Sequence, residues 1–215
     1  VDFTGCHGFC EQGTIVIVEP EGIFYTGVEV GDAAEIIQSH LRDGKPVERL
    51  FYHDPVTDEA IPHYAEVNFY KQQQRIILHR CGHINPENID DSIAWGGYEG
   101  LKKALLEMTP QAVIDEVAKA ELRGRGGAGF PTARKWGFCR SAPGDKKYII
   151  CNADEGDPGA FMDRSILEAD PHALVEGLTI AGYAIGADEG YIYVRAEYPL
   201  AVKRVRKALE QAQAK

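Results

Sequence analysis

The alternation of strands and helices in residues 148–215 constrains the fold more than any other feature of this sequence. The short apolar run Tyr148–Cys151 is typical of a strand, and Asp170 then begins a helix that Gly186 ends. A second strand is predicted at Tyr191–Val194, and a helix is predicted from about Pro199 to the end of the sequence. Strands that alternate with helices usually form a parallel sheet with covered faces, so this part of the chain is predicted to be α/β.

The earlier part of the chain follows a different pattern. Thr14–Val18 and Ile23–Thr26 flank a turn and predict a hairpin, and a helix is predicted between an N-cap at Asp32 and Gly44. Residues 45–80 are predicted to be a linker with one short strand at Arg75–His79, because residues 45–75 are rich in proline, charge and glutamine. The aromatic residues of this stretch nevertheless suggest that it packs against another part of the protein: Phe51, Tyr52, Tyr64, Phe69 and Tyr70. We therefore expect an α+β ending at 1–44, a linker at 45–80 and an α/β domain at 81–215.

The charge balance and the cysteine count limit the classes of function. The chain has 33 acidic and 23 basic residues, a net charge of −10, which argues against generic binding to nucleic acids or anionic membranes. No apolar run approaches the roughly 20 residues that span a bilayer, and no signal peptide is visible. Five cysteines are an odd number and too few for a disulfide scaffold, so a reducing, cytoplasmic location is expected.

The segment Arg123–Phe138, RGRGGAGFPTARKWGF, combines glycine with positive charge. Its glycines let backbone N–H groups approach an anion, because no Cβ obstructs the turn, and a helix predicted from about Thr132 adds its positive end. No acid lies between Leu122 and Gly144, so the segment suits a phosphate-bearing ligand. The glycines are Gly124, Gly126, Gly127 and Gly129, and the basic residues are Arg123, Arg125, Arg134, Lys135 and Arg140.

Other interpretations of the glycine-rich segment are weaker. Gly124–Gly129 formally matches G-x-G-x-x-G, but a Rossmann site needs a preceding strand, and residues 113–122 have a helical period. The sequence is not a P-loop, because no Gly-Lys-Ser/Thr follows at the required spacing. A purely structural glycine-rich loop on a basic surface stays an open alternative.

An acidic loop, Asn152–Gly159, follows the first predicted strand of the α/β domain. Ligands of open α/β sheets bind beyond the carboxyl ends of the strands, and carboxylates there accept hydrogen bonds from ribose or ribityl hydroxyls. The alternative is a solvated turn. Phe130 and Phe138 flank the glycine-rich segment and are predicted to stack on an adenine or nicotinamide ring, unless they are ordinary core residues. Together the two loops favour a nucleotide or flavin site.

Cys6 and Cys10 form a C-x3-C pair in a glycine-rich stretch. Thiolates at this spacing suit half of an iron–sulfur ligand set, while zinc and a plain thiol pair stay open alternatives. A four-thiolate cluster needs two more cysteines, which are expected before Val1.

Three stretches of the sequence resemble a known family. ELRGRGGAGFPTARKW and CNADEGDPGAFMDRSILEADPHALVEG resemble the FMN- and NADH-binding subunit of respiratory complex I and the diaphorase subunits of soluble NAD(P)-linked hydrogenases and formate dehydrogenases. GCHGFCEQG resembles the second cysteine pair of their thioredoxin-like [2Fe–2S] domain. The resemblance implies a parallel-sheet flavin-binding domain preceded by the end of a thioredoxin-like α+β domain. The family usually has Gly where this chain has Glu121 and Ala133.

The resemblance also implies roles for individual residues. Those matching the FMN cradle are Gly124, Arg125, Gly126, Gly127 and Lys135, with Ala128 and Gly129 in the same loop. Asn152, Asp154 and Glu155 match the loop that contacts the ribityl chain and the isoalloxazine ring. Phe130 and Phe138 match the aromatic residues around the NADH adenine, and Cys6 and Cys10 match cluster ligands. Asp157 matches an acid near the dinucleotide, where it would disfavour a 2′-phosphate.

The implied activity is that of a diaphorase, in which NADH passes a hydride to FMN and single electrons then leave through iron–sulfur clusters. No side chain is expected to act as acid, base or nucleophile. The implied partners are the iron–sulfur and catalytic subunits of a hydrogenase, a formate dehydrogenase or a respiratory complex. The chain is expected to be a fragment, with further flavin-pocket residues and [4Fe–4S] ligands downstream. The alternative is a non-catalytic wiring or docking module that binds no nucleotide.

Overall fold

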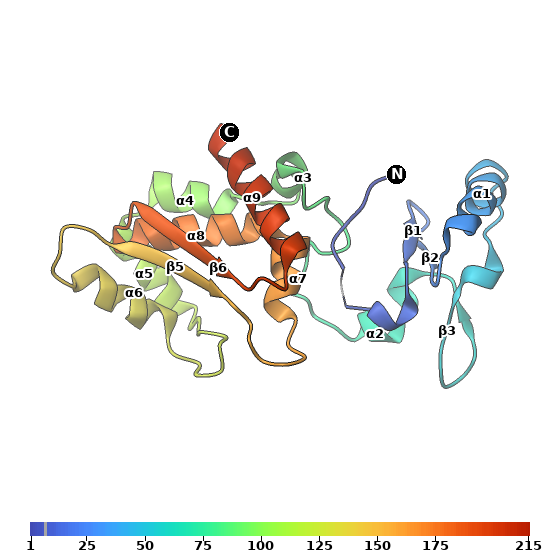
Figure 1. Ribbon diagram of the computed structural model, residues 1–215, viewed down its shortest axis with the longest axis horizontal. Coiled ribbons are helices and arrows are strands. Elements are labelled where there is room, and N and C mark those ends of the chain that lie inside the picture. The colour runs from blue at the N-terminus through green and yellow to red at the C-terminus, as the bar shows by residue number, and fades with distance from the viewer. Residues whose placement is uncertain (7) are drawn as a thin grey trace. The chain divides into compact units, whose positions relative to one another are not determined.

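The computed structural model describes residues 1–6 and 8–215. The chain divides into two compact units. One comprises residues 8–76, and the other combines residues 77–215 with the first residues of the chain. Figure 1 shows the helices and strands of both units.

The smaller unit, residues 8–76, contains the predicted hairpin. Strands β1 (Val16–Val18) and β2 (Ile23–Tyr25) pair antiparallel, with Val16 opposite Tyr25. The other elements are short: α1 (Ala33–Glu35), which continues as a π-helix over Ile36–Arg42, the antiparallel pair β3 (Tyr52–His53) and β4 (Ala60–Ile61), and α2 (Asn68–Lys71). Single 3-10 turns lie at Cys10–Gln12, Val30–Asp32, Glu48–Leu50 and Tyr64–Glu66.

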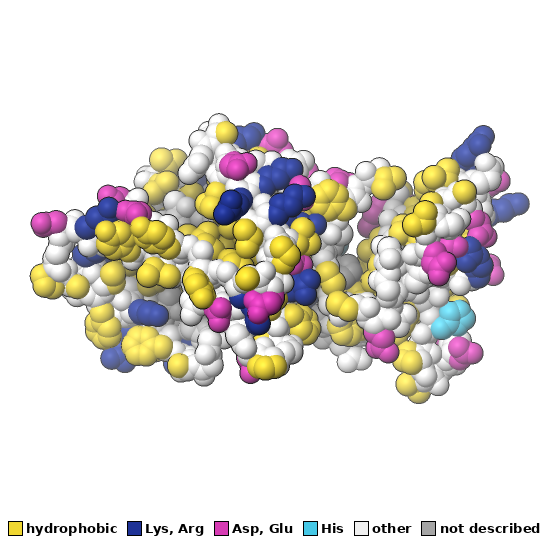
Figure 2. All heavy atoms as spheres, in the orientation of Figure 1, with side chains coloured by type: hydrophobic (Ala, Val, Ile, Leu, Met, Phe, Trp, Pro, Cys, Tyr) yellow, Lys and Arg dark blue, Asp and Glu magenta, His cyan; other side chains and the backbone are white. Residues whose placement is uncertain are grey.

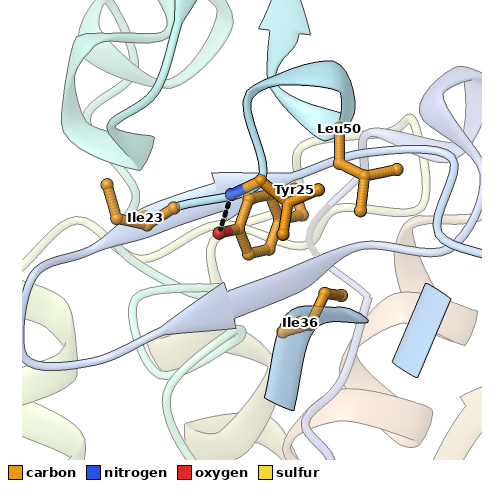
Figure 3. Packing of buried hydrophobic residues seen from close by; sticks show 5 residues of the cluster. Ile23, Tyr25, Ile36 and Leu50 are labelled. Atoms are coloured by element: carbon orange, nitrogen blue, oxygen red, sulfur yellow. Dashed lines mark hydrogen bonds between the residues drawn. The ribbon is translucent and has the colours of Figure 1, made fainter. Parts of the chain in front are cut away.

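Two clusters of buried side chains hold this unit together. Figure 3 shows the first, in which Ile23, Tyr25, Ile36 and Leu50 point toward one another. The Tyr25 hydroxyl accepts the backbone N–H of Val47 at 3.0 Å, so a polar group inside the cluster is satisfied. The second cluster consists of Phe24, Tyr52, Val67 and Tyr70. Residues 47–70 therefore supply core side chains to this unit, which a solvated linker would not do.

One local prediction for this region is wrong, and another is confirmed only in part. Residues 75–79 lie in a bend and turns, and not in a strand, because Ile76 is 74% exposed where the chain passes between the units and has no strand beside it. Asp32 occupies the N-cap position of α1, as predicted, but its side chain accepts no hydrogen bond from that helix. Its carboxylate instead accepts the Glu29 N–H at 2.8 Å and pairs with Arg49 at 2.6 Å.

The larger unit confirms the predicted parallel sheet. Strands β5 (Tyr148–Ala153) and β6 (Glu189–Val194) pair in parallel from Tyr148 opposite Glu189 to Ala153 opposite Val194. Its helices are α3 (Ile89–Ala94), α4 (Glu99–Glu107), α5 (Pro110–Lys119), α6 (Thr132–Ser141), α7 (Met162–Ala169), α8 (Pro171–Ile185) and α9 (Pro199–Ala214). Asp170 caps α8 by accepting the Ala173 N–H, and Gly186 ends it with φ +81°, both as predicted. Helix α7 was not predicted.

The two faces of this sheet differ. One face packs on helices, where Ala153 of β5 is buried with Leu167 of α7 and Val205 of α9. The opposite face exposes Tyr148, Ile150, Tyr191 and Tyr193, each by 46% or more. Figure 2 shows hydrophobic side chains gathered over the position of β5 and β6. Parallel sheets are usually covered on both faces, so this alternation of buried and exposed residues is unusual for them. No helix of residues 1–6 and 8–215 is both long and apolar enough to cross a membrane.

A buried polar network surrounds the start of α8. Asp170, 1% exposed, receives two hydrogen bonds from the guanidinium of Arg80, at 2.7 and 3.0 Å. The His172 ring lies between two partners, the Tyr98 hydroxyl at 2.7 Å from Nδ1 and the Gln211 amide oxygen at 3.1 Å from Nε2. Burial lowers the pKa of His172 and raises the pKa of Tyr98 to about 12. This geometry suits a neutral imidazole that donates from Nε2 and accepts at Nδ1.

The buried histidine predicts a loss of stability in acid. Because burial lowers the pKa of His172 in the folded state, the unfolded chain binds protons more readily, so stability falls as the pH drops below the usual histidine range. We expect the urea midpoint to fall between about pH 7.5 and pH 5.5. In the His172→Gln variant, which cannot gain this proton, the urea midpoint should depend less steeply on pH. An equal slope in the variant would place the pH dependence elsewhere.

Candidate functional site

The glycine-rich loop lies between α5 and α6 and is closed at its base. The Gly124 N–H donates to Phe130 O at 2.9 Å, and the Thr132 N–H donates to Leu122 O at 2.9 Å. Gly127 and Gly129 have φ values of +99° and +61°, a region that L side chains rarely adopt. A Cβ at Gly126 would meet no atom within 4 Å, so the loop presents backbone to open space. This loop therefore has the geometry of an anion cradle that needs glycine at specific positions.

The exposed cations of the loop and of α6 include Arg125, Arg134 and Lys135. Arg125, Arg134 and Lys135 form no ion pair with any described residue, in contrast to Arg49, Arg80 and Arg195 elsewhere in the chain. Arg123 donates to Gly129 O at 3.2 Å, and Arg140 donates to Ala184 O at 3.0 Å. Three cations without counter-ions around a glycine-rich loop fit a phosphate group.

The two aromatic residues predicted to hold a ring are both exposed and share one neighbour. Phe130 is 44% exposed and Phe138 is 58% exposed, so neither is a core residue. The guanidinium carbon of Arg134 lies 5.8 Å from the centroid of each ring. Arg134 and Phe138 lie four residues apart in α6 and therefore share one side of that helix, while Phe130 lies two residues before the helix begins. Arg134 also lines a hollow of about 250 Å³, together with Glu121 and Arg123.

The acidic loop follows the carboxyl end of β5, as predicted. The Asn152 side-chain oxygen accepts the N–H of Asp154 at 3.2 Å. The carboxylates of Asp154 and Asp157 accept no hydrogen bond from any residue in the described part of the chain, and Asp157 is exposed. These two acids are therefore available to a ligand.

Glu155 is occupied by the protein itself. Its carboxylate accepts the N–H groups of Asp163 at 2.7 Å and Arg164 at 3.0 Å, at the first turn of α7, and the Tyr198 hydroxyl at 3.0 Å. Its carbonyl accepts Arg195 Nη1 at 2.7 Å, and its φ is +48°. Burial, followed by the charge of Glu155, raises the pKa of Asp163. Glu155 thus fixes the acidic loop onto α7 and α9, a role that Arg195 and Tyr198 share and that no sequence signal indicated.

Both loops belong to the larger unit, and Figure 1 shows each extending from the sheet and helices toward the lower edge of the view. Among residues 1–6 and 8–215, no hydrogen bond, ion pair or ring contact joins the two loops. A ligand that contacts both would have to bridge them, so a joint site stays a prediction.

The predicted cluster ligands lie at the start of the chain. Cys6 and Cys10 are exposed, and the intervening His7 lies outside the described residues. The two cysteines belong to different compact units. In the described part of the chain, no three His, Cys, Asp or Glu side chains are grouped so that they could hold a metal ion. A cluster at Cys6 and Cys10 therefore stays a prediction that requires further ligands.

Glu121 follows α5 in a left-handed conformation, with φ +52°, and this gives a prediction for stability. Because a side chain is strained there and glycine is not, Glu121→Gly should raise the free energy of unfolding by about 0.5–1 kcal/mol in denaturant titrations. Glu116→Gly, on the exposed side of the same helix, should lower it by about 1 kcal/mol. If both changes destabilise equally, the positive φ carries no cost.

Comparisons with known proteins define the class of this domain. The family model of the Nuo51 FMN-binding domain matches residues 117–215, the part that contains both loops. Residues 117–215 therefore match the Nuo51 FMN-binding family, and for this part of the chain the resemblance predicted from the sequence is confirmed.

The relatives narrow the class further. The NAD-reducing hydrogenase HoxS subunit alpha of Cupriavidus necator is 50% identical over 207 residues, which cover 91% of this chain and 30% of that protein. The NADP-reducing hydrogenase subunit HndC of Solidesulfovibrio fructosivorans is 59% identical over 142 residues, or 66% of this chain and 29% of that protein. A subunit of the NADH-quinone oxidoreductase of Aquifex aeolicus is 50% identical over 157 residues, or 73% of this chain and 35% of that protein. All three relatives are subunits of oxidoreductases.

A solved structure has the same fold over the whole chain. The NAD⁺-reducing [NiFe]-hydrogenase in its air-oxidized state matches with a TM-score of 0.54 and 29% identity, and the match covers 100% of this chain and 33% of that one. The chain thus spans about a third of the length of the curated relatives it matches.

Proposed function

We propose that this chain is part of an NADH-oxidising diaphorase subunit that binds FMN at the glycine-rich loop. The observation that carries the proposal is the set of exposed cations without counter-ions around this loop, inside the region that matches an FMN-binding family. FMN ends in a phosphate, and backbone N–H groups together with Arg125 and Lys135 suit that group. When bound, FMN supplies the exchange between a two-electron hydride donor and one-electron acceptors.

The residues of the two loops have separate tasks in this proposal. Gly124, Gly126, Gly127 and Gly129 admit the phosphate because they place no Cβ in its path. Asn152 and Asp154, at the carboxyl end of β5, bind hydroxyl or N–H groups of the flavin, and Asp157 contacts the dinucleotide. Phe130 and Phe138 stack on its adenine. Glu155 holds the acidic loop in place through α7 and Tyr198.

The beginning of the chain has an electron-transfer role in the proposal. Residues 1–44 form the end of a thioredoxin-like domain in which Cys6 and Cys10 bind a [2Fe–2S] cluster with ligands from outside these residues. The likeness to the hydrogenase subunit over 91% of the chain includes part of residues 1–44. The partners in the proposal are the iron–sulfur and catalytic subunits of a cytoplasmic hydrogenase, formate dehydrogenase or respiratory complex, and further [4Fe–4S] clusters carry the electrons onward.

A titration of FMN with the chain tests the proposal. We expect the chain to quench FMN fluorescence, and Arg125→Gln/Lys135→Gln to weaken binding at least about tenfold, because two charge-assisted contacts to the phosphate are lost. The matched control, Lys102→Gln/Lys103→Gln on α4, removes the same charge from an exposed helix and should leave binding within about twofold.

The outcomes separate the two candidate functions. FMN fluorescence that the wild-type chain does not change would favour a docking module that binds no nucleotide. If both double variants weakened FMN binding equally, the effect would come from the net charge of the chain and not from the loop. That result would contradict a phosphate cradle at the loop.

A further inference from the structure

The Arg134 side chain lies where a stacked adenine would have to go. Its guanidinium carbon is 5.8 Å from the ring centroids of both Phe130 and Phe138. A purine and a guanidinium are planar groups that stack on the same phenyl faces, so they compete for these two rings. An adenine between the rings therefore requires the guanidinium to move aside.

Among the described residues, the Arg134 guanidinium has no acidic partner in its present position. Arg134 is exposed, and neither an ion pair nor a hydrogen bond ties its side chain to any residue in the described ranges 1–6 and 8–215. Apart from its contacts with the two phenyl rings, Arg134 lines the hollow of about 250 Å³ that Arg123 also lines. Arg123 is held in place there by its hydrogen bond to Gly129 O at 3.2 Å. Arg123 and Arg134 thus line one hollow whose volume is large enough for a phosphate.

We propose that Arg134 is a specificity-determining residue that binds the 2′-phosphate of an NADP(H) adenosine in this hollow, together with Arg123. The inference rests on the proposed function, because it takes Phe130 and Phe138 as the adenine site. The ribose and its 2′-substituent lie at the edge of a stacked adenine, which is where a displaced Arg134 remains. A guanidinium binds phosphate bidentately, so the 2′-phosphate offers Arg134 a new partner that NAD(H) lacks.

Two acids oppose this preference. Glu121 also lines the hollow, and its carboxylate repels a phosphate there. Asp157, in the acidic loop, would disfavour the 2′-phosphate if it contacts the dinucleotide as proposed above. The net preference of the protein for NAD(H) or NADP(H) depends on the balance of these charges. Loss of Arg134 alone is expected to lower the affinity for the 2′-phosphate.

The test compares two probes, 5′-AMP and adenosine 2′,5′-bisphosphate, with the 215-residue chain by isothermal titration calorimetry at constant ionic strength. Arg134→Gln should reduce the ratio of the affinity for the bisphosphate to the affinity for 5′-AMP by at least about tenfold, mainly because the bisphosphate binds more weakly. Arg134→Lys should give an intermediate ratio, because it keeps the charge and loses the bidentate geometry. Lys103→Gln, an equal loss of charge on α4, should leave the ratio unchanged.

A further variant tests the position of the phosphate. Glu121→Gln removes the acid from the hollow and should raise the preference for the bisphosphate by about twofold or more. An unchanged ratio in Arg134→Gln would overturn the inference while leaving the proposed function intact, provided that 5′-AMP binds. Failure of the wild-type chain to bind either probe would instead contradict the adenine site itself, and with it the nucleotide part of the proposed function.

Discussion

Asp170→Asn is expected to lower the free energy of unfolding by about 4 kcal/mol, because it leaves the Arg80 guanidinium buried without a counter-charge. Arg80 and Asp170 are 4% and 1% exposed, and two hydrogen bonds join them. Among residues 1–6 and 8–215, the remaining partners of the Arg80 side chain are the hydroxyl and carbonyl of Ser92, at 3.2 and 3.4 Å, which are neutral. Urea titration of the wild type and the variant would measure the loss.

The control for this prediction is an exposed ion pair in the same unit. Glu99 and Lys102 are 3.9 Å apart and more than 60% exposed, so Glu99→Gln should cost less than about 1 kcal/mol. Arg80→Met/Asp170→Asn, which removes both buried charges, should cost less than the sum of the two single changes. A loss of under about 1 kcal/mol in Asp170→Asn would show that water reaches Arg80, contrary to the burial described above.

Glu155→Gln is expected to lower the free energy of unfolding by about 2–3 kcal/mol, because an amide cannot accept all the hydrogen bonds that this carboxylate receives. Three donors converge on its two oxygens: the N–H groups of Asp163 and Arg164 and the hydroxyl of Tyr198. The –NH₂ group of glutamine would face at least one of them. Hydrogen exchange at the amides of residues 163 and 164 should accelerate, while exchange in α5 should not.

Asp154→Asn provides the matched change in the same loop. The Asp154 side chain accepts no hydrogen bond from the described residues, so the free energy of unfolding of this variant should differ from that of the wild type by less than about 0.5 kcal/mol. In the proposed function it contacts the flavin, so FMN affinity should fall. The two variants are thus expected to separate stability from binding. Equal stability of both would show that Glu155 does not fix the acidic loop.

Local sequence signals were sufficient where an element depends on its own residues. Asp170 and Gly186 mark the two ends of α8, since a cap and a positive-φ glycine act within one helical turn. The strands β5 and β6 were visible as short runs of β-branched and aromatic residues, and their order with the helices predicted parallel pairing. The density of glycine and the absence of acids in residues 123–140 likewise identified the candidate anion site.

Contacts between distant residues were not readable in this way. The proline-rich stretch after residue 45 looked like a linker, yet Leu50, Tyr52 and Tyr70 are buried in the smaller unit. The two strands were expected to be covered on both faces, yet Tyr191 and Tyr193 are exposed. Burial depends on which surfaces meet in three dimensions, and residue composition alone does not specify that.

The sequence by itself determined the chemistry of the candidate site: which residues are glycine, which are cations without acids nearby, and which carboxylates follow a strand. Only the tertiary structure decided how these residues are used. It directed Glu155 to α7 and Tyr198, and it placed Arg134 between Phe130 and Phe138. The physical reason is that the residue types fix charge and backbone freedom, whereas packing between separate segments decides which partner each side chain reaches.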